Sequence, residues 1–108
     1  MKVISVPLSI DAMNRLDIDS CIEGDLQELE LKQTDYEQLW DTGIFENLNQ
    51  SLGINIDDYE DEMIPFESLP NAIKTLENYQ QNSGDIVDKL KSLMEVALSR
   101  KTGVFFFF

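Results

Sequence analysis

The sequence contains a run of five apolar residues, VFFFF at positions 104–108, and this run constrains the fold more than any other feature. A strand with one face in water alternates apolar and polar residues, whereas this run carries no polar residue. Left exposed, it would promote aggregation. We therefore predict an inner strand of a small sheet, buried on both faces or covered by helices on one side and by a packed loop on the other.

The rest of the chain supplies a second strand and several helices. The β-branched segment VISV at 3–6 ends at Pro7 and predicts a strand beside the C-terminal one. Residues 26–32 fit a strand or a helix, 54–65 a loop or an exposed strand, and 80–84 a polar linker. The helix signals are, in order, Ser9 as a cap, a Thr34–Glu37 capping box, a break at Gly43 before a stripe ended by Gly53, Ser68 with Pro70, and Ser83 before the apolar stripe of 86–98.

These elements predict an α/β (α+β) fold in a single domain over residues 1–108. We expect a small, mostly antiparallel sheet that includes the N- and C-terminal strands and is packed with four or five helices. A chain of this length can bury one modest core without disulfides.

The charge is strongly acidic and unevenly distributed. The chain has 21 acidic and 8 basic residues, for a net charge of −13, and residues 17–67 contain 16 of the acids with Lys32 as their sole base. This charge argues against binding to nucleic acid or an anionic membrane, because both are polyanions. It favours a cationic partner, a metal ion or plain solubility, and its segregation indicates a polarised surface.

The residues of common catalytic sites are missing. The chain has no histidine, no glycine-rich phosphate loop and a single cysteine, Cys21, which we expect to be a small buried residue. We therefore predict no catalytic residue, no cofactor and no enzymatic activity. The lone cysteine and the lack of a signal or membrane-spanning segment favour a cytoplasmic location.

One alternative is a calcium-binding regulatory module. Residues 19–30 have the frame of an EF-hand loop, with Gly24 at the turn position and Cys21, a poor ligand for a hard cation, at the third position. The candidate ligands are Asp19, Glu23, Asp25 and Glu30.

The densest acidic segment is the predicted partner-binding site. It contains Asp57, Asp58, Tyr59, Glu60, Asp61 and Glu62. Such a run can steer a basic partner into contact, and Tyr59 can supply an apolar anchor. Trp40 is either a second anchor or a core residue, and the acidic run can equally be a solvated loop. If the segment fills a basic cleft, reversing Asp58 and Asp61 to lysine should weaken binding while leaving the fold intact.

Two stretches resemble the small immunity proteins of bacterial contact-dependent growth inhibition and polymorphic toxin systems. They are YEQLWDTGIFENLNQSLGINIDDYEDEMIP at 36–65 and ALSRKTGVFFFF at 97–108. The resemblance implies a monomeric protein that binds and neutralises a cognate toxin domain, such as a nuclease with a basic cleft, in a 1:1 complex. A non-enzymatic acidic adaptor, whose charge serves only solubility, is the remaining interpretation.

Overall fold

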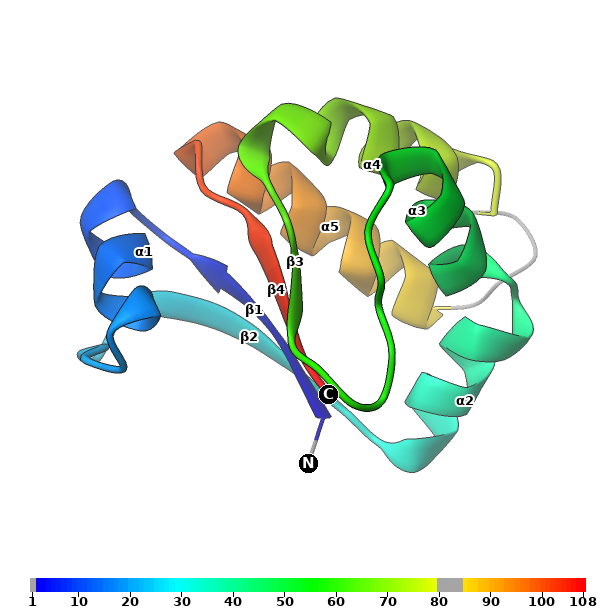
Figure 1. The fold of residues 1–108 in the computed structure, drawn as a ribbon, viewed down its shortest axis with the longest axis horizontal. Helices are drawn as coiled ribbons and strands as arrows, with labels where there is room; N and C mark the ends of the chain where they lie inside the picture. The colour runs from blue at the N-terminus through cyan, green and yellow to red at the C-terminus, as the bar shows by residue number, and fades with distance from the viewer. Residues whose placement is uncertain (1, 80–84) are drawn as a thin grey trace.

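The computed structural model describes residues 2–79 and 85–108 and shows an α+β fold, as predicted (Figure 1). The predicted linker 80–84 and the Ser83 cap lie outside the described residues. The strands are β1 (Lys2–Pro7), β2 (Leu26–Leu31), β3 (Glu62–Ile64) and β4 (Val104–Phe107). The helices are α1 (Ile10–Asp17), α2 (Gln33–Asp41), α3 (Ile44–Leu52), the 3-10 turn η1 (Phe66–Ser68), α4 (Leu69–Glu77) and α5 (Asp85–Arg100).

The sheet has the strand order β2-β1-β4-β3, and every neighbouring pair is antiparallel. The phenylalanine-rich strand β4 is therefore an inner strand beside β1, which confirms that prediction. Burial on both faces is only half correct, because Val104 and Phe106 are fully buried whereas Phe105 and Phe107 are half-buried. Alternate residues of a strand point to opposite faces, so the two pairs lie on different sides of the sheet.

Helices α2 to α5 pack against one face of the sheet and enclose the core (Figure 1). Phe106 meets Phe45 of α3 edge to face, with ring centroids 6.0 Å apart. The short helix α1 lies at the end of the sheet away from the two chain termini (Figure 1). Its residue Met13 lines a hollow with Phe105, so α1 belongs to the opposite face and the helices cover the two faces unequally.

The turn into β4 explains why threonine and glycine precede the phenylalanines. The Thr102 hydroxyl donates a buried hydrogen bond of 2.7 Å to the Pro7 carbonyl oxygen, which joins the end of β1 to the start of β4. A β-carbon on Gly103 would lie 2.7 Å from the Ile64 carbonyl oxygen. Glycine is needed there so that β3 can approach β4 closely.

Two of the predicted helix caps form and two are wrong. Ser9 accepts a hydrogen bond of 2.9 Å from the Ala12 amide, and Gly53 ends α3 in the left-handed conformation with φ of 67°. The Thr34–Glu37 capping box does not form. Helix α2 starts at Gln33 instead, because Asp35 accepts a hydrogen bond of 3.1 Å from the Lys32 amide.

The predicted cap at Ser68 also fails. Its side chain makes no capping hydrogen bond, because the preceding 3-10 turn already gives this residue a helical backbone. Pro70 does lie in the first turn of α4, where its missing amide hydrogen is not needed. Within the described ranges, no helix is both long and apolar enough to cross a membrane.

Candidate partner-binding surface

The predicted site lies on the loop that connects α3 to β3, and this loop is held firmly at its start. Ile56 is 1% exposed and packs in the core. The Asn49 side chain accepts a hydrogen bond of 2.7 Å from the Ile56 amide and donates one of 3.2 Å to the Ile56 carbonyl oxygen. One side chain thus replaces the strand partner that this stretch of backbone lacks.

Asp57 shapes the tip of the loop. Its carboxylate accepts hydrogen bonds from the Tyr59 and Glu60 amides at 2.8 and 3.0 Å, and from the Asn55 side chain at 2.8 Å. The two amide donors lower the pKa of the Asp57 carboxyl group, because they stabilise its charged form. Asp57 is therefore a turn-forming residue whose acceptor capacity is largely occupied within the chain.

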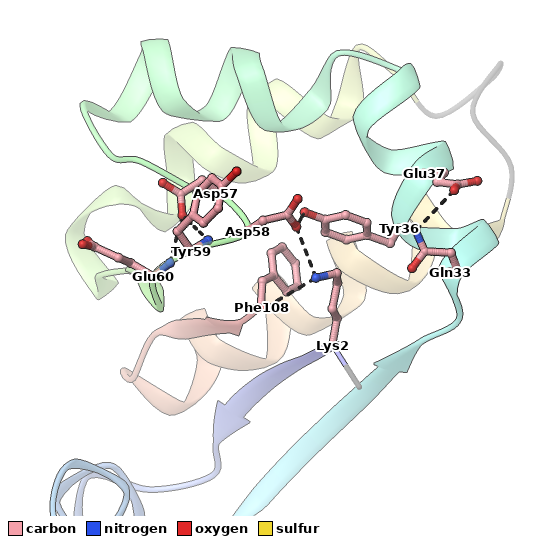
Figure 2. A network of polar contacts seen from close by, with 9 residues as sticks. All are labelled: Lys2, Gln33, Tyr36, Glu37, Asp57, Asp58, Tyr59, Glu60 and Phe108. Atoms are coloured by element: carbon pink, nitrogen blue, oxygen red, sulfur yellow. Dashed lines mark hydrogen bonds and ion pairs between the residues drawn. The ribbon is translucent and has the colours of Figure 1, made fainter.

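Asp58 attaches the loop to the body of the protein through two residues distant in sequence (Figure 2). The Lys2 ammonium lies 3.2 Å from the Asp58 carboxylate, and the Tyr36 hydroxyl donates a hydrogen bond to the same carboxylate. The hydroxyl and the ammonium lower the pKa of Asp58. Burial first, and then the bond to Asp58, raise the pKa of Tyr36 to about 12.

The Lys2 ammonium holds its position through three further contacts. It lies 4.5 Å from the centroid of the Tyr36 ring and 5.9 Å from that of Phe108, and it donates a hydrogen bond of 3.4 Å to the Phe108 carbonyl oxygen. Figure 2 shows Lys2 between Asp58 and Phe108, so the first strand, the last residue and the acidic loop meet at one cation.

The remaining acidic residues of the segment divide into a free tip and an anchored end. Tyr59 is 91% exposed, and Glu60 and Asp61 are exposed too. Their side chains form no hydrogen bond or ion pair with any residue that the structure describes. Glu62 instead accepts hydrogen bonds from the Asn55 amide at 2.8 Å and from the Met63 amide at 2.9 Å. The loop is thus held on both sides of an exposed tip.

The structure therefore places five of the six predicted residues on one loop and the sixth, Glu62, at the start of β3, and it separates their roles. Asp57, Asp58 and Glu62 hold the loop, while Tyr59, Glu60 and Asp61 are exposed and have side chains without a hydrogen bond or ion pair to the described residues. The expectation that reversing Asp58 leaves the fold intact is corrected, because a lysine there would face Lys2 and lose the Tyr36 bond. These anchoring contacts join residues 22 to 56 positions apart, so no local pattern in the sequence signals them.

Trp40 belongs to the core margin, as the core interpretation predicts. It is half-buried and meets Phe45 edge to face, with ring centroids 5.0 Å apart, and Tyr36 at 6.3 Å.

The calcium alternative is wrong, because the segment does not form a helix-flanked loop. Residues Leu26–Leu31 form strand β2, which pairs Glu30 with Val3 of β1 in a sheet ladder. Asp25 is only 5% exposed and is held by Arg15 through two hydrogen bonds of 2.7 and 2.6 Å. No group of three or more potential metal ligands occurs in 2–79 and 85–108.

The prediction that Cys21 is a buried residue is also wrong, because its side chain is exposed to solvent. The loop around it is held by Asp25, which also accepts a hydrogen bond of 2.9 Å from the Ile22 amide. Desolvation first, and then the Asp25 carboxylate, raise the pKa of the Cys21 thiol, so the thiol is not activated as a nucleophile.

The Arg15–Asp25 pair predicts an acid-sensitive stability. The Arg15 side chain first, and then the Ile22 amide, lower the pKa of Asp25 from 3.8 to about 2. A carboxyl group with a lowered folded-state pKa stabilises the fold above its unfolded pKa and loses that contribution as the pH falls through the folded value. We expect the melting temperature to fall between about pH 4 and pH 2.

The matched variant for this prediction is Asp25→Asn, measured by circular dichroism over the same pH range. It should melt at a lower temperature at neutral pH and should lose less on acidification than the parent protein. A slope remains, because the pKa values of Asp57 and Asp58 are lowered too. Equal slopes for the two proteins would show that the ion pair is not responsible.

The surface as a whole carries an acidic charge that the chain does not neutralise. Only two of the 21 carboxylates form ion pairs, Asp25 with Arg15 and Asp58 with Lys2, among the residues the structure covers. The acidic part of the sequence supplies β2, α2, α3, β3 and the loops between them (cyan to green in Figure 1). Most of its carboxylates are exposed to solvent.

Comparisons with known proteins add one structural relative. The sequence matches no protein-family model and no curated protein. The fold is similar to that of the Neisseria DNA mimic protein DMP12, with a TM-score of 0.72 and 16% sequence identity over 100% of both chains. At this level of identity, the comparison establishes that the chain has the same fold as that protein.

Proposed function

We propose that this protein is an inhibitor that acts by binding: it covers the nucleic-acid-binding surface of a basic protein, and that partner is the nuclease domain of a bacterial toxin. The observation that carries this proposal is the excess of exposed carboxylates without cationic partners, part of it on a loop held at both ends. A domain that needed its acids only for its own stability would pair them with its bases, and this one pairs two over residues 2–79 and 85–108.

The physical basis is the likeness between this surface and a nucleic-acid backbone. DNA carries a dense array of negative charges, and proteins that bind it present lysine and arginine to the phosphates. An acidic protein surface can attract the same basic cleft, and the long-range field speeds the encounter. The exposed Tyr59 ring, which lies beside two carboxylates, can add an apolar contact at the centre of such an interface.

One structural similarity and one sequence resemblance support the proposal. The solved structure with the same fold is described as a DNA mimic, and we extend that mode of action to this chain. The resemblance of residues 36–65 and 97–108 to toxin immunity proteins gives the class of partner. Together they favour an inhibitor over a plain acidic adaptor, and neither suggests catalysis.

The test is calorimetric titration of this protein into the toxin domain encoded beside its gene, at about 0.1 M and about 1 M salt, where the Debye lengths are about 10 and 3 Å. We expect a 1:1 complex with a Kd near the nanomolar range that weakens strongly at high salt, and displacement of the toxin from a DNA oligonucleotide. Tight binding without displacement of DNA would disprove mimicry. The absence of binding at both salt concentrations would contradict the proposed function.

A further inference from the structure

The face of the sheet opposite α2 to α5 carries an aromatic stripe between two acidic margins. Phe105 and Phe107 lie on this face, half-buried and stacked at an interplanar angle of 16° with centroids 6.1 Å apart. The register of the strands gives two rows of facing residues, namely Glu28, Ser5, Phe105 and Met63 in one, and Glu30, Val3 and Phe107 in the other.

Two hollows open on this face, and Phe105 and Met63 line both of them. One has a volume of about 250 Å³ and lies against α1, where Met13, Asn14 and Asp17 complete its lining. The other has a volume of about 220 Å³ and continues onto the acidic loop, where Asp61 and Glu62 complete its lining. The apolar stripe is thus continuous with the predicted partner-binding loop.

The charges around these hollows all have one sign. Neither lining contains a lysine or arginine, whereas each contains at least one carboxylate. The opposite margin of the face carries the exposed Glu28 and Glu30 of β2. Arg15 lies on α1, but its guanidinium is paired with the Asp25 carboxylate, which neutralises its positive charge. A bound group must therefore be apolar at its centre and cationic at its ends.

We propose that this open sheet face, with the Phe105–Met63 hollows at its centre, docks an amphipathic segment of a basic partner protein through an arginine side chain. This inference rests on the proposed function and names a second part of the same interface. A planar guanidinium stacks on aromatic rings and also forms paired hydrogen bonds with carboxylates, and Phe105 and Asp61 offer both kinds of partner in one hollow. Methionine side chains adapt their shape to such a ligand.

A second copy of this chain fits the face less well than a basic partner does. Two copies would bring the carboxylates of both margins together, and like charges in contact oppose association. Nucleic acid is disfavoured by the same charges, although aromatic rings can stack on bases.

The experiment uses the full chain with the methionine methyl groups labelled with ¹³C. Met13 and Met63 line the hollows, and Met94 is a core residue with 0% exposure, so it is an internal control. The probe is a short blocked peptide in which arginine alternates with leucine, and the control peptide has glutamate in place of each arginine. We expect saturable shifts of the Met13 and Met63 signals with the arginine peptide, and none at Met94.

The variant Phe105→Ser adds an energetic readout, because this half-buried ring lines both hollows. We expect a roughly fivefold or larger rise in the Kd of the arginine peptide, as expected for the loss of a cation–π contact. Unchanged Met13 and Met63 signals, equal shifts with the glutamate peptide, or comparable shifts at Met94 would each overturn the proposal. The titration needs no toxin, so its failure is distinct from a failure of toxin binding.

Discussion

Replacing Phe106 by alanine is expected to reduce the free energy of unfolding by about 3–5 kcal/mol, the usual cost of removing a fully buried phenylalanine. Phe106 is 0% exposed on an inner strand and meets Phe45 and Phe108 edge to face, so no neighbour can fill the space. Small domains are stable by about 5–15 kcal/mol, so a loss of this size removes between about a fifth and all of that stability. Urea denaturation followed by Trp40 fluorescence measures the loss, because Trp40 contacts Phe45.

The adjacent phenylalanines are the matched controls for this variant. Phe105→Ala and Phe107→Ala make the same chemical change in the same strand, but both rings are half-buried on the open face. We expect losses of only about 1–2 kcal/mol for each, because less apolar surface returns to water. Equal losses at Phe105 and Phe106 would contradict the assignment of an open face, and with it the docking surface.

This contrast shows what the apolar run could and could not predict. The absence of polar residues correctly places β4 inside the sheet, because an edge strand of this composition would aggregate. Of its two alternatives, burial on both faces is only half correct, because Phe105 and Phe107 are half-buried. The composition of the run shows that every position in it is apolar, but it does not show which face of the strand the helices cover. Phe105 and Phe107 therefore look like core residues until the covering helices are seen to lie on one side.

The acidic segment is a second case in which the sequence predicts only part of what the structure shows. Its composition identifies the loop, but the division into anchoring and free residues depends on contacts across the fold. Asp58 is held by Lys2 and Tyr36, which the topology brings together through β1 and α2.

The wrong cap at Thr34 has a local cause, because Asp35 and Thr34 compete to accept the first free amides and Asp35 forms the bond. Helix positions were predictable because each has an apolar stripe that packs on the same core.

The division of the acidic loop leads to the second prediction, the double variant Glu60→Lys/Asp61→Lys. Both side chains are exposed and form no hydrogen bond or ion pair with the described residues, so their reversal leaves the anchors at Asp57, Asp58 and Glu62 unchanged. We expect an unchanged melting temperature and at least a hundredfold rise in the Kd for the toxin domain, or about 2.7 kcal/mol, because two attractions become repulsions against a basic cleft.

The control variant must change the net charge equally at another place. Glu77→Lys/Glu95→Lys does so on α4 and α5, where both glutamates are exposed and lie outside the acidic segment. If binding depends on overall charge alone, the two double variants weaken it equally and the loop has no special role. If the loop enters the cleft, the first variant loses most of the affinity while the second changes chiefly the association rate, because distant charges act through long-range steering. Kinetic measurement of both variants at low and high salt separates these cases, since steering is screened at high salt and direct contact is screened less.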